Sequence, residues 1–371
     1  MREEKSATLE PYLVNPWENR MRRWEKARMP ARIFRKGWAG FRPVIGGMLP
    51  GSGTVFGGGY IYGQESQYTQ FQVNARYSTK GYTQYDGMIE FPSPQRNSWL
   101  RTQIRAAYLD YTQMNFFGVG NETSKDDKSF FRQLGYFVRA GVAADLSRFL
   151  EVNGRFERLQ TQTKDGEREP TLGSMFPGVP GYGDGATDFN IFGAGMKLKL
   201  FDQWDFPPVG AVITIEGARY DDQTSDMYDS FKLVGEAGAI IPLGPRSRRV
   251  ALRFRTAHMQ PDSEREVPFY LMETIGGAKT LRGYSEFRFR DTRNMILNME
   301  YRWEVMPYID FAFFADTGKV FSDLEDFNLK NLHWGAGWGI RVHAPGDMFF
   351  SIDLAGSPEG FVIHLSSGMG F

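Results

Sequence analysis

Two segments in the last third of this 371-residue chain carry its most informative residues. The first opens a long loop and reads Thr274-Ile275-Gly276-Gly277-Ala278-Lys279-Thr280-Leu281-Arg282-Gly283-Tyr284. The second belongs to an alternating pattern and reads Phe311-Ala312-Phe313-Phe314-Ala315-Asp316-Thr317-Gly318. Glu300, on the strand predicted between them, and Asp316 share one parity, which we assign to the inside of a closed structure. A guanidinium held by carboxylates is a strong, directional contact, so we expect Arg282 to bind Glu300 and Asp316.

On both sides of these segments, apolar and polar residues alternate with a period of two. In one example Val250, Leu252 and Phe254 alternate with Arg249, Arg253 and Arg255. Arginines on the second face of strand after strand would destabilise a dry core. In a wide barrel that face is wet, while the apolar face meets lipid. A mean hydropathy of -0.43 together with 31 Phe and 17 Tyr fits this arrangement, because only alternate residues face lipid.

The alternating segments and the turn signals between them predict an all-β fold, a 16-stranded antiparallel transmembrane β-barrel with a short N-terminal helical segment. The predicted strands lie near 40–48, 52–63, 67–79, 83–91, 98–113, 129–145, 148–162, 186–201, 208–221, 227–241, 248–260, 292–305, 308–316, 331–343, 347–355 and 361–371. An even number is typical of bacterial single-chain barrels. We assign the tight links 49–52 and 345–347 to the periplasmic end and the long polar links 114–128, 163–185 and 261–291 to the outside.

Composition excludes several classes of function. The chain has no run of 18 apolar residues, so it predicts no transmembrane helix. It has no cysteine and only four histidines, which disfavours a thiolate site or a structural zinc site. The formal net charge of zero argues against nucleic-acid binding. We therefore expect a protein that is not an enzyme and that needs neither a metal nor a cofactor.

Residues 1–38 differ from the rest, because ten Lys/Arg against five Asp/Glu leave them with a charge of +5. Trp17, Met21 and Trp24 have helical spacing and are surrounded by arginines, so they predict a short basic amphipathic helix. One interpretation places this periplasmic segment against a phosphate-rich membrane surface. The other is a solvated helix that caps the periplasmic mouth of a barrel spanning 39–371. Residues 1–10 lack the apolar core of a signal peptide, so we expect this sequence to be the mature form.

The spaced set Leu281-Arg282-Gly283-Tyr284, Glu300 and Asp316-x-Gly318 resembles the Omp85 superfamily of outer-membrane barrels, which includes BamA/TamA-like proteins and bacterial surface antigens. The resemblance implies an integral barrel of the bacterial outer membrane whose sixth loop folds inward between strands eleven and twelve. The strand count places 261–291 there. It also implies that Arg282, Gly283 and Tyr284 dock on the wall at Glu300, Asp316 and Gly318, with Gly283 allowing close approach or a positive φ.

Two further features bear on this resemblance. The segment Phe116–Thr123 resembles a second loop of the family. The family's barrels usually follow POTRA domains, and 38 residues are too few for even one such domain. We therefore expect a member that lacks POTRA domains.

The C-terminus carries an apolar set of one parity. Its members are Phe361, Ile363, Leu365, Met369 and Phe371. The set resembles the β-signal by which outer-membrane barrels are recognised for folding, and it also suits the lipid-facing side of a last strand. The resemblance implies a weak seam where this strand meets the first strand, near 40–48.

Three other chemistries compete for the same residues. Asp316-Thr317-Gly318 spells the aspartic-protease tripeptide, but that chemistry needs a second carboxylate and the chain has no second copy. His333, His343 and His364 share the inward parity, so they form either a metal- or pH-sensitive cluster or ordinary polar filling of the lumen. His364 and Ser366 would suit a barrel phospholipase only on an outward face, and we assign them inward.

We therefore expect an Omp85-like barrel that assists insertion, assembly or translocation of proteins, or perturbs lipid locally, through a weak seam. Its expected partners are outer-membrane lipids and either an unfolded outer-membrane protein client or a periplasmic partner. Two alternatives remain, namely a passive diffusion channel in which Arg282 is one of many lumen arginines, and a homodimer whose seam holds lipid.

Overall fold

The computed structural model describes residues 37–49, 51–63, 66, 68–93, 98–201, 209–244, 247–306, 309–344 and 347–366. The predicted N-terminal helix with Trp17, Met21 and Trp24 lies outside the described residues, as do Met369 and Phe371. Among the residues described, no helix has the length and apolar character needed to cross a membrane.

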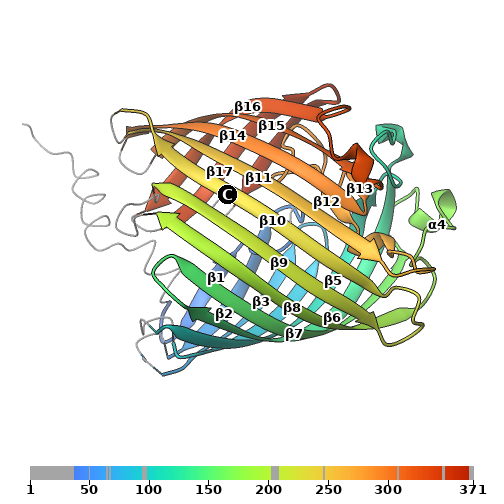
Figure 1. The fold of residues 1–371 in the computed structure, drawn as a ribbon, viewed down its shortest axis with the longest axis horizontal. Coiled ribbons are helices and arrows are strands. Elements are labelled where there is room, and N and C mark those ends of the chain that lie inside the picture. The colour runs from blue at the N-terminus through green and yellow to red at the C-terminus, as the bar shows by residue number, and fades with distance from the viewer. Residues whose placement is uncertain are drawn as a thin grey trace, which may run out of the picture.

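Sixteen antiparallel strands form one continuous sheet in chain order, which curls into a barrel (Figure 1). The strands are β1 (Phe41–Ile45), β2 (Val55–Tyr62), β3 (Gln70–Ser78), β4 (Thr83–Phe91), β5 (Leu100–Phe116), β6 (Ser129–Asp145), β7 (Leu150–Asp165), β8 (Ala186–Phe201), β9 (Gly210–Asp222), β10 (Ser230–Pro242), β11 (Arg248–Pro261), β14 (Arg293–Met306), β15 (Ile309–Phe321), β16 (His333–Ala344), β17 (Asp347–Ser357) and β18 (Gly360–Ser366). The predicted fold class and all sixteen predicted strands are confirmed, with shifts of a few residues at their ends.

Alternation along each strand separates an apolar outer face from a polar inner face. Tyr85 and Tyr108 pair across β4 and β5 and expose 54% and 41% of their surface. Asp86, the next residue on β4, is buried and accepts a hydrogen bond from Asn74 Nδ2 at 2.9 Å. Successive strand residues point to opposite faces, so the inner polar groups pair with one another across neighbouring strands.

Strand length is distributed unevenly around the barrel. β5 and β6 contain 17 residues each, whereas β1 contains 5. β1 and β18 are the two ends of the sheet order, and within the described residues no strand pairing joins them. The hydrogen-bonded wall is therefore deepest at β5–β8 and shallow at β1.

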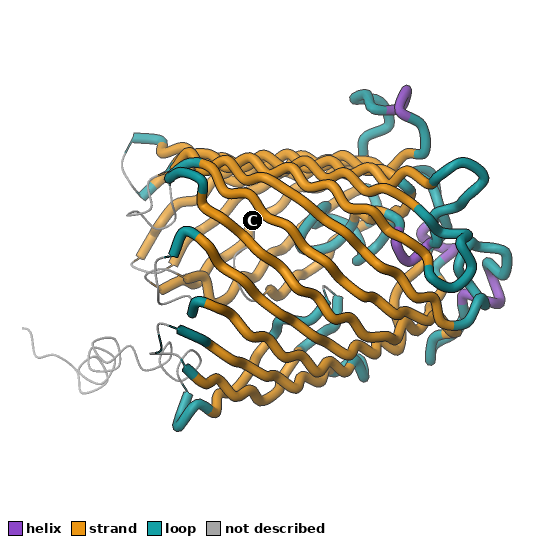
Figure 2. The backbone as a smooth tube through the Cα atoms, turned by 60° about the horizontal axis from the view of Figure 1, so that its bottom comes forward, coloured by secondary structure: helices purple, strands orange, loops and turns teal. Residues whose placement is uncertain are grey.

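The long links gather at one end of the barrel (Figure 2). They include η1 (Lys125–Asp127), α4 (Leu172–Met175), η2 (Phe269–Leu271) and η3 (Leu324–Asp326). The loop between β11 and β14 also contains a small two-stranded sheet, β12 (Glu273–Ile275) and β13 (Phe289–Asp291). This sheet was not predicted, because three-residue strands are too short to show a period of two.

One predicted link position is wrong. Antiparallel neighbours in chain order put alternate links at the same end, so the link between β1 and β2 lies with the long loops. A β-carbon placed at Gly51 in that link would lie 2.7 Å from Glu286 Cγ of the long loop. The tightness of the 49–52 turn suggested the opposite end, but link length does not determine the side.

Candidate functional site: the inward-folded loop

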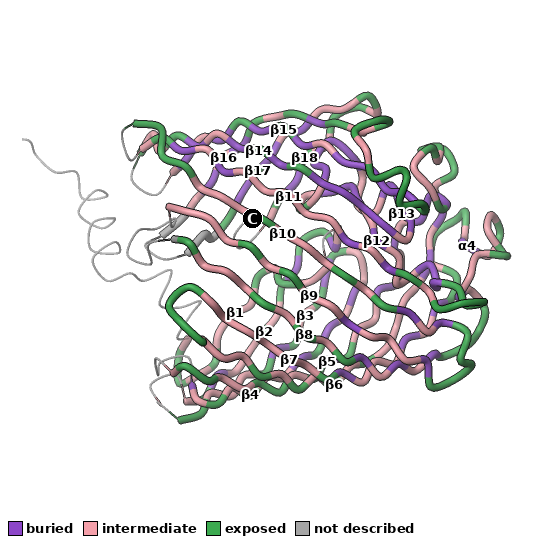
Figure 3. Tube along the Cα trace, in the orientation of Figure 1, coloured by how far each residue is buried: buried purple, intermediate pink, exposed green. Residues whose placement is uncertain are grey.

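The loop between β12 and β13 contributes buried residues to an apolar cluster that it shares with the barrel wall. Leu281 and Tyr284 pack in one apolar cluster with Ile275 and Phe289 of the flanking strands and with Ile296 and Val320 of the wall. Figure 3 shows buried positions along β12, β13 and β14–β17. This packing orients the intervening residue Arg282 toward the wall.

Arg282 binds both carboxylates singled out from the sequence. Its Nε and Nη2 atoms donate to the two oxygens of Asp316 at 2.7 and 2.8 Å, and its backbone N–H donates to Asp316 Oδ2 at 3.2 Å. Nη1 donates to Glu300 Oε2 at 2.5 Å. The guanidinium carbon also lies 3.6 Å from the centroid of the Phe314 ring. We call the contacts of Arg282 with Glu300 and Asp316 the loop lock.

The electrostatic environment keeps the loop lock charged. Burial lowers the pKa of the Arg282 guanidinium, but its hydrogen bonds to Asp316 and the charge of Glu300 outweigh burial, so the pKa lies above its ordinary value. A charged arginine with paired carboxylate acceptors satisfies the polar groups of all three side chains in a water-poor site.

Glu300 is also the centre of a wider charge network that the sequence did not predict. Arg302 Nε and Arg341 Nη2 both donate to its carboxylate at 2.7 Å. Arg341 Nη1 donates in turn to Asp353 Oδ1 on β17 at 2.6 Å. Including the loop lock, three buried arginines face three buried carboxylates, so the network is neutral. It links the loop to β14, β15, β16 and β17.

Gly283 and Gly318 sit where backbones approach closely. A β-carbon at Gly283 would lie 2.6 Å from Ser357 Cβ and 2.7 Å from Gly356 O, and one at Gly318 would lie 2.6 Å from Met295 O. The backbone of Gly283 does not have a positive φ. Of the two roles expected for this glycine, close backbone approach is therefore the one that applies. Ser357 Oγ donates to Gly283 O at 2.7 Å, which holds the loop against β17.

The sequence match that decides the family covers most of this barrel. The Omp85 superfamily domain matches residues 55–356, which include the loop and the wall it contacts. The chain belongs to the Omp85 superfamily. It is an integral β-barrel of the bacterial outer membrane.

Solved structures share the fold of this Omp85 barrel. BamA from Haemophilus ducreyi lacking POTRA domains 1–3 aligns with a TM-score of 0.62 at 14% identity, over 88% of this chain and 68% of that one. CdiB from Escherichia coli aligns with a TM-score of 0.58 at 12% identity, over 90% of this chain and 63% of that one. CdiB from Acinetobacter baumannii aligns with 0.54 at 10%, over 86% and 57%, so this chain spans less than two thirds of either CdiB chain. No curated protein sequence matches the chain.

A second arginine of the Omp85 loop, Arg288, connects it to two neighbouring loops. Its guanidinium donates to Glu359 Oε1 between β17 and β18 at 2.9 Å and to Thr123 O between β5 and β6 at 2.5 Å. Asn121, in the segment whose family resemblance was noted from sequence, accepts a hydrogen bond from Val320 N at 3.1 Å. The parity argument missed Arg288 because loop residues have no assigned face.

Glu286 lies where the loop meets both chain-end strands. Its Oε1 accepts a hydrogen bond from Ala278 N at 2.9 Å and lies 3.8 Å from Nδ1 of His364 on β18. A β-carbon built on Gly51, in the link after β1, would lie 2.7 Å from its Cγ. Burial raises the pKa of the Glu286 carboxyl to about 7, and the Ala278 N–H and the charges of Lys80 and Lys279 oppose that rise.

His333 and His364, the two inward histidines whose side chains are described, bind different partners. His364 Nε2 donates to Arg282 O at 2.7 Å, whereas His333 donates to Asn121 O at 2.9 Å and stacks on Phe289 at 3.8 Å. The His343 side chain lies outside the described part of the structure. Across the described residues, no group of three His, Asp or Glu side chains is arranged to hold a metal ion.

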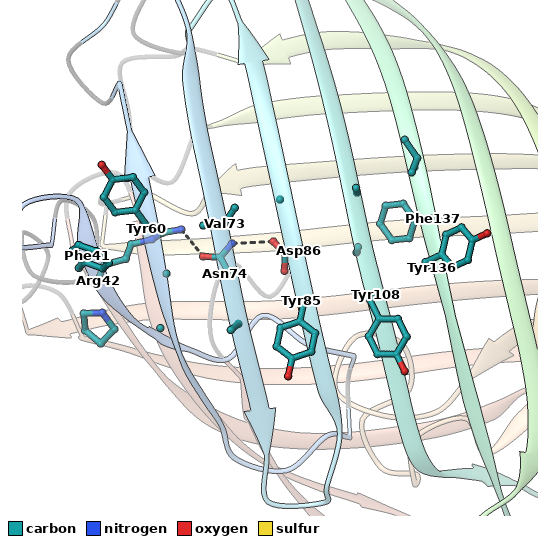
Figure 4. A pocket seen from close by; sticks show the side chains of 18 residues that line it. Phe41, Arg42, Tyr60, Val73, Asn74, Tyr85, Asp86, Tyr108, Tyr136 and Phe137 are labelled. Atoms are coloured by element: carbon teal, nitrogen blue, oxygen red, sulfur yellow. Dashed lines mark hydrogen bonds between the residues drawn. The ribbon is translucent and has the colours of Figure 1, made fainter.

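The barrel's outer surface beside β1 is hollowed. A cavity of about 1000 Å³ runs across β1–β6 (Figure 4). Its floor is made by small residues that fall into two runs of cross-strand partners, namely Pro43, Gly58 and Ala75 on β1–β3 and Gly87 and Ala106 on β4–β5. Its sides are aromatic rings, namely Phe41, Tyr60, Tyr85, Tyr108 and Tyr136. We call this cavity the outer groove.

At the opposite end of the sheet order from β1, β18 presents apolar residues on the outer surface of the barrel. Phe361, Ile363 and Leu365 expose 85%, 67% and 63% of their surface. In an outer-membrane barrel this face meets lipid, which removes the cost of exposing apolar groups to water.

Proposed function

We propose that this Omp85 barrel assists the insertion, assembly or translocation of proteins at a seam between β1 and β18. The observation that carries the proposal is that β1, only five residues long, and β18 are the two ends of the sheet order and that no pairing joins their described residues. Few hydrogen bonds need to break for such a seam to open. A strand edge in lipid has unsatisfied backbone groups, so it favours pairing with a client strand.

The inward-folded loop supports the wall next to this seam. Arg282 and Gly283 tie it to β14–β18, and Glu286 places it against His364 of β18 and Gly51 beyond β1. In this proposal the loop lock keeps β14–β17 rigid while the seam strands separate. Tyr284 and Gly318 support it by packing the loop against the wall.

The two chain ends have proposed roles as well. Phe361, Ile363, Leu365, Met369 and Phe371 act as the β-signal and as the seam's last strand. Residues 1–38, with Trp17, Met21 and Trp24, contact the membrane surface or a periplasmic partner. A client delivered by that segment would reach the seam from the side where β1 begins.

The decisive experiment uses the protein in liposomes with an unfolded outer-membrane protein as client. Client folding is followed by heat-modifiable gel mobility. Because the chain has no cysteine, one cysteine in Phe41–Ile45 and one in Gly360–Ser366 give a disulfide that closes the seam alone. The matched control joins Met196 and Ile215, an outward pair of β8 and β9 far from the seam in the sheet order.

We expect accelerated client folding that the seam disulfide abolishes and the control disulfide leaves unchanged. Acceleration that survives a closed seam would refute lateral entry. Absence of acceleration together with steady ohmic conductance would instead identify a passive diffusion channel.

The outer groove favours a second candidate function, a structural barrel that holds lipid or a second copy beside its seam. Its tyrosine rings and small-residue floor suit an acyl chain packed against the wall. Native mass spectrometry of the purified barrel tests this, with Ala106→Trp as the variant that fills the groove. Retained lipid or dimer that Ala106→Trp removes would support the candidate, and an unchanged spectrum would refute it.

A further inference from the structure

Arg290 is a buried arginine of the inward-folded loop, and the described residues give it no acidic partner. It is 3% exposed, and burial alone lowers the pKa of its guanidinium, to about 10. Within the described chain no carboxylate pairs with it, whereas Arg282 and Arg288 each bind at least one. A buried charge without a counter-charge is costly, so its presence calls for an explanation.

Aromatic rings hold Arg290 in place. Its guanidinium carbon lies 5.6 Å from the centroids of Phe116 and Phe269 and 5.9 Å from that of Phe131. Its Nη1 donates to the carbonyl oxygen of Phe269. Cation–π attraction offsets part of the desolvation cost but supplies no counter-charge and no acceptor for the remaining N–H groups.

The accessible part of this guanidinium is its Nη2 atom, a group that Arg282 uses for a carboxylate. Arg282 donates to Asp316 from Nε and Nη2 together. In Arg290 the Nε is enclosed without a partner. Its Nη2 forms no hydrogen bond and is not enclosed in the same way. A carboxylate oxygen matches the accessible Nη2 in charge and in hydrogen-bonding capacity.

The open side of Arg290 borders a cavity in the lumen. The cavity has a volume of about 290 Å³ and is half enclosed by the loop and the inner wall of β5–β7. Leu109 and Leu159 of the wall and Met272 and Phe287 of the loop supply apolar lining beside the guanidinium. A largely apolar cavity that is bordered by one guanidinium can accommodate a ligand with a single negative charge and an apolar chain.

We propose that this cavity binds a small amphiphilic carboxylate, with the headgroup on Arg290 and the apolar chain along Leu109 and Met272. The proposal is independent of the seam, since it concerns an inner site formed by the loop and β5–β7. A bound carboxylate would neutralise Arg290 and stabilise the docked loop by binding only to that state.

The test measures binding of tritium-labelled octanoate to the full chain in lipid nanodiscs, with empty nanodiscs subtracted. We expect saturable binding that octanol, the uncharged analogue, does not displace. Arg290→Met removes the charge while keeping an apolar side chain, and it should weaken binding roughly ten-fold or more, the effect of losing a charged hydrogen bond. Arg148→Met, at an exposed arginine between β6 and β7, is the matched control and should bind like the parent.

A second variant keeps the proposal testable if Arg290→Met disturbs the loop. Leu109→Trp fills the cavity with Arg290 intact and should also abolish saturable binding. Equal binding by Arg290→Met, or no saturable binding by the parent, would refute the site. Displacement of octanoate by octanol would show that the site recognises the apolar chain alone. Displacement by a low concentration of chloride would show that any anion can bind. Either result would overturn the proposed ligand class.

Discussion

Arg282 and Arg290 lie eight residues apart in one loop, are both buried, and are stabilised in opposite ways. Arg282 enters a wall region of alternating arginines and carboxylates, where every charge has a partner. Arg290 enters a box of phenylalanines with one carbonyl acceptor. The first environment fixes position by directional bonds, and the second tolerates a cation without completing its hydrogen bonds. We infer that the contacts of Arg282 stabilise the docked loop, whereas the surroundings of Arg290 leave room for a ligand.

The largest expected effect comes from removing the acid at the centre of the Arg282 side. Glu300→Gln leaves Arg282, Arg302 and Arg341 around a neutral amide. We expect the free energy of unfolding to fall by about 3–5 kcal/mol, as for other broken buried ion pairs. Thermal loss of the heat-modifiable folded band measures this. Glu325→Gln, at an exposed loop position, is the control, and equal midpoints for both variants would contradict a stabilising network.

The second effect depends on pH and tests the contact between loop and seam strands. The Glu286 carboxyl has a pKa of about 7 in the docked loop and an ordinary value near 4.5 when the loop is free. The docked state therefore holds its proton more tightly, so docking is fully stabilised below pH 4.5. It weakens as pH rises through 7, by up to about 3 kcal/mol.

Hydrogen exchange of amides 276–288, corrected for the intrinsic pH dependence, reports this docking. Lys80, Lys279 and His364 also face Glu286, so the variant Glu286→Gln separates its contribution from theirs. The pH dependence between 4.5 and 7 should disappear in Glu286→Gln. If it persists, another group titrates.

A smaller effect is expected from crowding the loop backbone at the Arg282 side. Gly283→Ala places a methyl group against Ser357 and Gly356. We expect a loss of about 1–3 kcal/mol, typical of overpacking, with faster exchange of the Arg282 amide. Gly178→Ala is a matched change, since a β-carbon there meets nothing within 4 Å. A Gly283→Ala barrel as stable as Gly178→Ala would show that the loop adjusts freely.

The smallest effect should come from the aromatic box. Phe131→Leu removes one of the three rings that face Arg290, and Phe189→Leu removes an equally buried ring that lies away from it. Both variants lose packing, and Phe131→Leu also loses two aromatic contacts where Phe189→Leu loses one. With the cation–π attraction, we expect Phe131→Leu to cost about 1–2 kcal/mol more. Comparison of their unfolding midpoints measures it. No difference would mean that the rings act on Arg290 only as apolar walls.

Several features of the site were open to prediction because they depend on local rules. Side chains alternate strictly along a strand, so the inward assignment of Glu300 and Asp316 followed from parity alone. The structure brings both to Arg282. The link 49–52, by contrast, was assigned by its tightness, and strand order reversed that assignment.

The sequence by itself determined the number of strands, the face of each strand residue and the family of the barrel. These properties repeat every two residues or belong to a small set of spaced motifs. Only the tertiary structure decided that Arg341 and Asp353 complete the Glu300 network and that Arg288 reaches Glu359. Such contacts depend on the stagger of strands that are distant in the chain and on how a loop folds. In the sequence Arg282 and Arg290 are both loop arginines with no assigned face. Arg282 contacts carboxylates and Arg290 contacts aromatic rings because the folded loop passes first along β14–β15 and then against η2.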